Sequence, residues 1–158
     1  MADLMSIAFV CDGCDRPIAL RIERPRAGID CPACGRSHLL RVNEATITSG
    51  RIDRCLRCGL DRLYVQKDFN RKVGLGIFVL AAILSVPTWG LSLLAATLVD
   101  LTLYYVLGDV TICYGCGTQH RGCRRNPAHG AFDLHVAEAV DARGRAVAVG
   151  EGEQVTHR

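Results

Sequence analysis

The chain has 158 residues, nine cysteines and a formal net charge of +3 at pH 7. This length predicts one ordinary domain or two very small ones. Aromatic residues make up only 6% of the chain, so a small domain would need metal or disulfides to hold its core. Because a four-cysteine zinc site carries a charge of about −2, two such sites would cancel the positive surplus, and net charge gives no argument for nucleic-acid binding.

The first ten residues show no secretory signal peptide. Such a peptide has a basic start and a continuous apolar core, whereas this segment has no basic residue and its apolar stretch is short and interrupted. We therefore expect the segment to stay in the cytoplasm, where thiols remain reduced.

Two C-x-x-C pairs follow, Cys11/Cys14 and Cys31/Cys34, separated by sixteen residues. Each pair turns two sulfurs toward one point, and two facing pairs complete a tetrahedral four-sulfur site. The separation lies within the range typical of zinc sites. These four cysteines are therefore predicted to bind one Zn²⁺.

The segments around these pairs predict short strands at residues 18–22 and 38–42. Together with these strands, the two motifs resemble a zinc ribbon, which is a small β module, over residues 8–45. The motifs that carry the resemblance are Cys11-Asp-Gly-Cys14 and Cys31-Pro-Ala-Cys34-Gly35.

Two further pairs, Cys55/Cys58 and Cys113/Cys116, are 54 residues apart. This separation is too long for one continuous ribbon. It is explained if the apolar segment between the pairs is an insertion that leaves and returns to the same place. We therefore predict a second zinc site from these four cysteines, in a ribbon split by the insertion.

Glycine follows three of the four pairs, at Gly35, Gly59 and Gly117. A glycine at this position fits a turn that needs a positive φ, and the repetition strengthens the prediction of metal-binding turns.

Other uses of the cysteines stay open. Disulfides fit an oxidising location but fit the odd cysteine count poorly. Thioredoxin-type redox chemistry at the second pair lacks the surrounding βαβ pattern. Rubredoxin-like iron uses the same turns, because four-sulfur ligation does not distinguish zinc from iron.

A local site built from the last pair with His120 and Cys123 is a further alternative, but it would leave Cys55 and Cys58 without partners. We expect the remaining candidates to be ordinary neighbours or spare ligands. They are His120, Cys123, His129 and His135.

An apolar run covers residues 73–107, with Asp100 as its only acidic or basic residue. The run is too long for one membrane-spanning helix of about 20 residues, and residues 87–90 supply a turn in its middle. We therefore expect two helices, near 70–86 and 91–107, that form a transmembrane hairpin. A buried helical pair and a re-entrant hairpin are the alternatives.

Basic residues flank both ends of this run, and its turn has none. By the positive-inside rule, both termini and all cysteines would be cytoplasmic. The expected localisation is the cytoplasmic (inner) membrane, with two spans and the lipid bilayer as a partner. The flanking residues are Lys67, Arg71, Lys72, Arg121, Arg124 and Arg125.

Asp100 falls near the middle of the second expected helix. An ionised carboxyl group there costs at least about 2.5 kcal/mol on insertion scales unless it is partnered or protonated. Asp100 is therefore predicted either to contact a second protein or protomer inside the membrane, or to be protonated and bonded within its own hairpin.

Residues 131–140 predict a short amphipathic helix, with Phe132, Val136 and Val140 on one face. Beyond Asp141 we expect a mobile tail.

The segments Lys67-Asp-Phe-Asn-Arg71 and Val110-Thr-Ile-Cys113-Tyr-Gly-Cys116 resemble those of a loosely defined group of bacterial two-span membrane proteins with zinc ribbons. The resemblance covers about residues 55–135. It implies architecture and metal, but no activity.

The predicted fold class is therefore small β zinc ribbons plus an α-helical transmembrane hairpin that splits the second ribbon. The predicted parts are a first ribbon, two halves of a second ribbon, the hairpin and a tail. Their ranges are 1–48, 49–72 with 108–130, 73–107 and 131–158.

No catalytic motif is visible, and a zinc ion with four thiolate ligands has no open position for water. We expect a membrane-anchored cytoplasmic adaptor or accessory subunit, not an enzyme, with two Zn²⁺ per chain and a protein partner or second protomer. The alternatives are a rubredoxin-like iron protein for electron transfer and a nucleic-acid or regulator-binding module. Interleaved acidic residues and few stacking aromatics make nucleic acid the weaker partner. The arginines that would serve it are Arg16, Arg21, Arg24, Arg26, Arg36 and Arg41.

Overall fold

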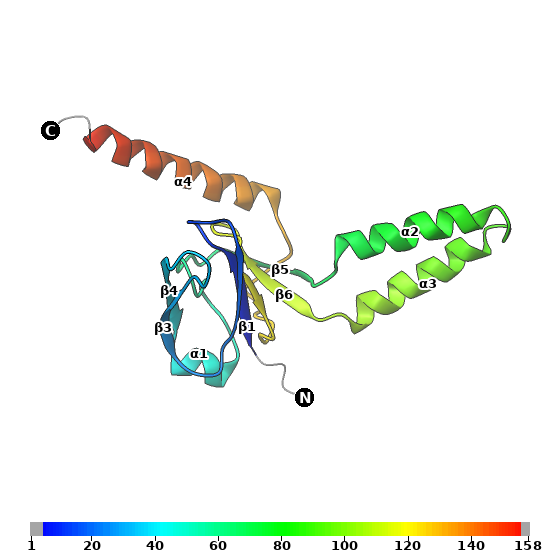
Figure 1. Ribbon diagram of the computed structural model, residues 1–158, viewed down its shortest axis with the longest axis horizontal. Helices are drawn as coiled ribbons and strands as arrows, with labels where there is room; N and C mark the ends of the chain where they lie inside the picture. The colour runs from blue at the N-terminus through cyan, green and yellow to red at the C-terminus, as the bar shows by residue number, and fades with distance from the viewer. Residues whose placement is uncertain (1–4, 156–158) are drawn as a thin grey trace. The chain divides into compact units, whose positions relative to one another are not determined.

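A five-stranded sheet joins segments from both halves of the chain in the computed structural model (Figure 1). The strand order is β2-β1-β7-β6-β5, and β1 pairs antiparallel with both β2 and β7. The structure describes the backbone of residues 5–155, and the side chains of Arg71 and of residues 145–155 lie outside that description. The strands are β1 (Ser6–Val10), β2 (Pro17–Arg21), β5 (Leu63–Lys67), β6 (Asp109–Cys113) and β7 (Gln119–Arg121).

Alternation along β1 directs its apolar side chains into the core. Ile7 and Phe9 are buried, at 1% and 4% exposure, because every second residue of a strand faces the same side. Ile7 stands opposite Leu20 on β2 and His120 on β7. The centre of the sheet therefore joins the first ribbon segment to the strand that follows the last cysteine pair.

A second sheet consists of β3 (Arg26–Asp30) and β4 (Ser37–Val42), paired antiparallel. Alternate residues of β4 are buried, namely His38, Leu40 and Val42, and the last two pack in one core cluster with Ile7 and Phe9. The short helix α1 (Glu44–Ser49) follows and ends at Gly50 in the left-handed region.

The expected transmembrane hairpin is wrong. Residues 73–107 do lie in two helices that pack together, α2 (Arg71–Ser85) and α3 (Leu91–Val106), close to the expected ranges. Among the described residues, however, no helix combines the length and apolar character needed to cross a membrane.

The physical reason is length. α2 has 15 residues and α3 has 16, which gives about 23–24 Å at 1.5 Å per residue, against a hydrocarbon core of about 30 Å. The prediction counted residues beside the turn as helical, whereas residues 86–90 are all in the turn. The predicted fold class, with its transmembrane hairpin, and the predicted multi-pass localisation in the inner membrane are therefore both incorrect.

The long helix α4 (Leu134–Val155) follows the second half of the chain. Its start is fixed by Asp133, whose side chain accepts a hydrogen bond of 2.8 Å from the His135 amide. The helix continues beyond Asp141 into the segment expected to be mobile, and residues 156–158 of that segment lie outside the described residues.

The chain divides into two units. The first comprises the residues up to Gln66 and from Val110 onward, and the second is Lys67–Asp109, which holds α2 and α3. All eight paired cysteines lie in the first unit.

Candidate metal centres

All four C-x-x-C pairs form the same turn. In each, the amide of the first cysteine donates to the carbonyl five residues on, and the amide four residues on donates back to the cysteine carbonyl, at 2.8–3.1 Å. The residue four positions on has a positive φ: it is Asp15 in the first pair and Gly35, Gly59 and Gly117 in the others. The first pair therefore forms the turn without glycine, and Asp15 takes the left-handed conformation that glycine adopts without strain.

The first centre brings Cys11, Cys14, Cys31 and Cys34 together. The sulfurs of Cys11 and Cys34 are 3.6 Å apart, and those of Cys14 and Cys31 are 3.7 Å apart. A tetrahedral zinc ion with bonds of about 2.3 Å places its sulfurs about 3.8 Å apart, whereas a disulfide requires about 2.05 Å. The four sulfurs are thus spaced for a metal ion.

The second centre brings Cys55, Cys58, Cys113 and Cys116 together across the insertion. Two of its sulfur separations, Cys55 to Cys116 and Cys58 to Cys113, are both 3.5 Å. The centre closes because β5, which follows one pair, lies beside β6, which leads into the other. The eight cysteines therefore form the two groups that the spacing predicts.

Amide and imidazole groups surround the sulfurs of the first centre. The Gly13 amide donates to the Cys11 sulfur at 3.4 Å, and His38 Nε2 lies 3.3 Å from the same sulfur. The backbone amides of Ala33 and Cys34 lower the pKa of the Cys31 thiol from its usual 9.0 to about 6. Donors of this kind favour the thiolate, which is the form that binds metal.

The second centre also contains a thiol that ionises readily. Hydrogen bonds from Cys113 and Cys55 lower the pKa of Cys116, and the same sharing of protons raises the pKa of Cys113. Thr118 Oγ1 lies 3.0 Å from the Cys116 sulfur and adds to the lowering.

The other candidates do not join either centre. His120 and His129 are buried, and three of their four ring nitrogens have no hydrogen-bond partner in the described part of the chain. Burial lowers the pKa of His120 to about 4 and raises that of Cys123 to about 11. The local site with His120 and Cys123 is thus not among the metal-sized groups of the described residues. His135 lies near the start of α4 and is exposed.

Asp100 is exposed on α3. It lines a cavity of about 220 Å³ within the second unit, together with Lys67, Phe69, Gly74, Tyr104 and Leu107.

Sequence reasoning missed two residues that act on the centres, His38 and Arg57. A repeat could have marked His38, because Cys34-Gly-Arg-Ser-His38 matches Cys116-Gly-Thr-Gln-His120, and both histidines are buried. No local signal marks Arg57, whose partner Asp12 is 45 residues away.

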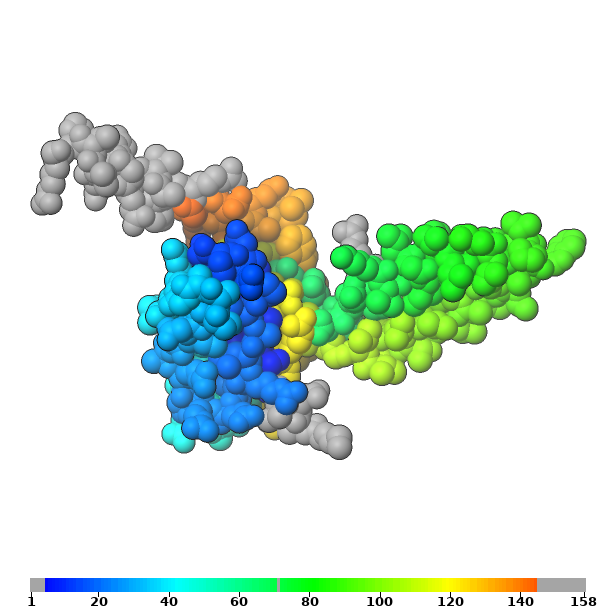
Figure 2. All heavy atoms as spheres, viewed as in Figure 1, coloured from blue at the N-terminus to red at the C-terminus, as the bar shows by residue number. Residues whose placement is uncertain are grey.

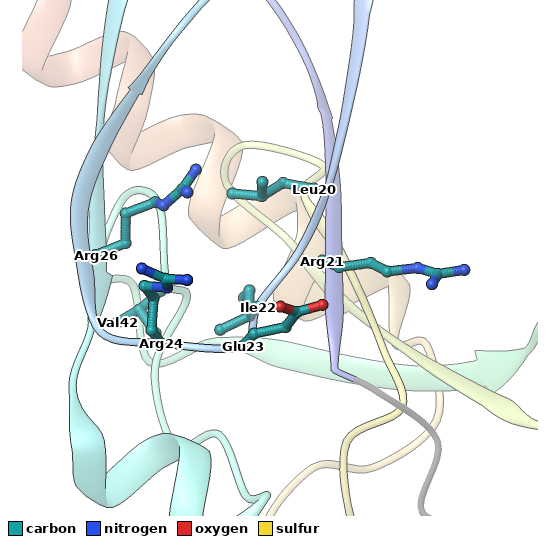
Figure 3. Close-up of a pocket in the computed structure, with 7 residues that line it drawn as sticks. All are labelled: Leu20, Arg21, Ile22, Glu23, Arg24, Arg26 and Val42. Carbon is teal, nitrogen blue, oxygen red and sulfur yellow. The ribbon is translucent and has the colours of Figure 1, made fainter.

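A basic pocket of about 260 Å³ lies at the end of β2 (Figure 3). Figure 3 shows Arg24 and Arg26 directed into the space that faces Leu20 and Ile22, whereas Arg21 is directed away. Within the described part of the chain, neither Arg24 nor Arg26 makes an ion pair. Glu23 and Val42 complete the lining.

Comparisons with protein-family models, with curated proteins and with solved structures each found no match to the chain. Nothing in them supports the resemblance to bacterial two-span membrane proteins.

Proposed function

We propose that the chain is a zinc-stabilised adaptor module, in which each four-sulfur centre holds one structural Zn²⁺. The observation that carries this proposal is the sulfur spacing of 3.5–3.7 Å in both centres. Tetrahedral four-sulfur sites hold zinc or iron, and thiols that ionise readily are present in each centre to begin binding.

A structural role fits the packing. The buried cluster around the second centre consists of Cys55, Leu63 and Cys113, with Leu60 and Cys116 packed against it. So small a core contributes little stability by itself, whereas metal binding to a four-cysteine site contributes directly to folding. Because four sulfurs fill the coordination positions of zinc, no position remains for a catalytic water.

Metal analysis of the purified full chain tests the proposal. We expect about two zinc ions per chain and loss of the folded circular-dichroism signal when a chelator removes them. One ion per chain would contradict the second centre. Bound iron with visible absorbance would instead support the electron-transfer alternative.

The adaptor role needs a surface for a partner, and the second unit provides an apolar one. Eighteen large apolar residues between Val73 and Val106 are exposed, most of them by about half or more, along α2 and α3 (green in Figure 2). At about 60–120 Å² per buried side chain, they present roughly 1,000 Å², enough for one stable interface of about 800 Å² per partner. We propose that a second copy of this chain covers this surface, which otherwise exceeds what a monomer leaves open.

A second candidate function is binding of a small phosphate ester, and the pocket in Figure 3 favours it. Arg24 and Arg26 offer two guanidinium forks with no ion-pair partner in the described chain, and such forks bind phosphate in bidentate fashion. The apolar side chains of Leu20, Ile22 and Val42 line the same space, which suits an organic group attached to the phosphate.

Isothermal titration with adenosine monophosphate tests this candidate, with adenosine and inorganic phosphate as separate arms. Binding of the monophosphate that weakens at least tenfold in Arg24→Gln and Arg26→Gln, but not in the matched surface variant Arg16→Gln, supports it. Equal binding by all three variants would contradict it.

A further inference from the structure

The turn that carries Cys55 and Cys58 is held by contacts to the first ribbon. Leu56, the first residue between these cysteines, is 4% exposed and packs in the core cluster that contains Cys11 and Cys31. Its carbonyl accepts a hydrogen bond of 2.6 Å from the amide of Arg41, which lies on β4. One ligand turn of the second centre is therefore anchored in the core of the first.

Arg57, the second residue between these cysteines, also reaches the first centre. Its guanidinium pairs with the carboxylate of Asp12, which lies between Cys11 and Cys14. The guanidinium also lies over the Phe9 ring, 4.7 Å from the ring centroid. Although Asp12 is largely exposed, the Arg57 side chain is only 13% exposed.

The contacts continue from Phe9 to a sulfur of the first centre. The Phe9 ring meets the His38 ring edge-on, with centroids 5.2 Å apart, and His38 Nε2 lies 3.3 Å from the Cys11 sulfur. An unbroken series of contacts thus links the turn of one centre to a ligand of the other.

We propose that Leu56 and Arg57 couple the two metal centres, so that metal binding at one centre raises the affinity of the other. The inference rests on the proposed function, because it requires both centres to bind metal. Closing either centre orders its turns, and the ion pair between Asp12 and Arg57 transmits that order to the other centre. The second ion then binds to a turn whose ordering cost has already been met, and the effect is reciprocal.

Electrostatics gives the coupling its expected sign in the absence of Arg57. Each loaded centre carries about −2, so two loaded centres in one small unit repel each other. The buried guanidinium of Arg57 offsets this repulsion. Removing its charge should therefore abolish positive coupling and favour the singly loaded form.

Native mass spectrometry of the reduced, metal-free full chain titrated with Zn²⁺ tests the coupling. At half saturation, two independent sites leave at least half of the molecules singly loaded, whatever their separate affinities. A coupling of about tenfold, within the range typical of linked sites, lowers that fraction to about one quarter. We expect a fraction below one half for the unaltered chain.

Two variants and one control assign the coupling to the ion pair. Arg57→Gln and Asp12→Asn should raise the singly loaded fraction to one half or more, and Asp12→Asn changes only a largely exposed side chain. Arg54→Gln, at an exposed arginine just before the same turn, should leave the fraction unchanged.

The outcomes separate this inference from the proposed function. If the unaltered chain binds two Zn²⁺ with half or more of the molecules singly loaded at half saturation, the coupling is absent. If both variants keep the fraction of the unaltered chain, the ion pair does not carry it. If the unaltered chain binds fewer than two Zn²⁺, the proposed function itself fails.

Discussion

The left-handed residue in each cysteine turn allows one backbone effect to be measured with an internal control. Gly35 has φ of +73°, and a Cβ built there meets nothing within 4 Å. Gly35→Ala therefore tests backbone strain without a steric clash. Asp15 occupies the same position in the first turn with φ of 54°, so Asp15→Ala replaces one non-glycine residue by another.

The expected magnitude follows from two opposing terms. A left-handed conformation costs an alanine roughly 1–2 kcal/mol, whereas loss of the glycine reduces the freedom of the unfolded chain and returns about 0.4–1 kcal/mol. Gly35→Ala should therefore lower the free energy of unfolding by about 1 kcal/mol, and Asp15→Ala should change it by less than about 0.5 kcal/mol.

Thermal unfolding of the metal-saturated chain, followed by circular dichroism, measures the difference. For a domain of this size, 1 kcal/mol shifts Tm by about 2–4 °C. If Gly35→Ala and Asp15→Ala lower Tm equally, the four turns are not equivalent and the argument from φ is wrong.

Three further predictions concern other parts of the molecule. Burial lowers the pKa of His120 from 6.5 to about 4, so the unfolded chain takes up a proton between these pH values that the folded chain does not. The stability that results is present above pH 6.5 and is lost as pH falls to 4, by about 3 kcal/mol; urea titrations should show that His120→Leu removes this part of the pH dependence, and parallel curves would contradict it. Thr118→Val removes the hydroxyl 3.0 Å from the Cys116 sulfur and should weaken Zn²⁺ binding about tenfold in a chelator competition; unchanged affinity would show that the contact does not act on the metal. Light scattering should find the full chain dimeric or larger and the double variant Leu94→Asp, Leu98→Asp monomeric; a monomeric unaltered chain would contradict self-association through α2 and α3.

The features that the sequence predicts well depend on short spacings. A C-x-x-C turn is closed by hydrogen bonds within six residues, and the strand that follows Cys34 is predicted at 38–42 and observed as Ser37–Val42. The grouping of Cys55 with Cys116 spans 61 residues, but it was accessible because the alternative left two cysteines without partners.

The membrane prediction failed because apolar composition does not determine where a helix ends. The apolar residues from Val73 to Leu107 were divided at the turn into two segments of nearly spanning length. In the structure, residues 86–90 form the turn and α3 stops at Val106, so each helix is shorter than the apolar run assigned to it.

The contacts between the centres were inaccessible for a different reason. Arg57 reads as one more arginine in an arginine-rich chain, because its partners Asp12 and Phe9 lie more than 40 residues earlier. Their proximity depends on the turn at Cys55 docking Leu56 into the first core, which no short spacing encodes. The cysteine motifs thus specify two separate centres, whereas the residues between the cysteines join them, and this is why the variants that test the joint function lie at Asp12 and Arg57 rather than at the ligands.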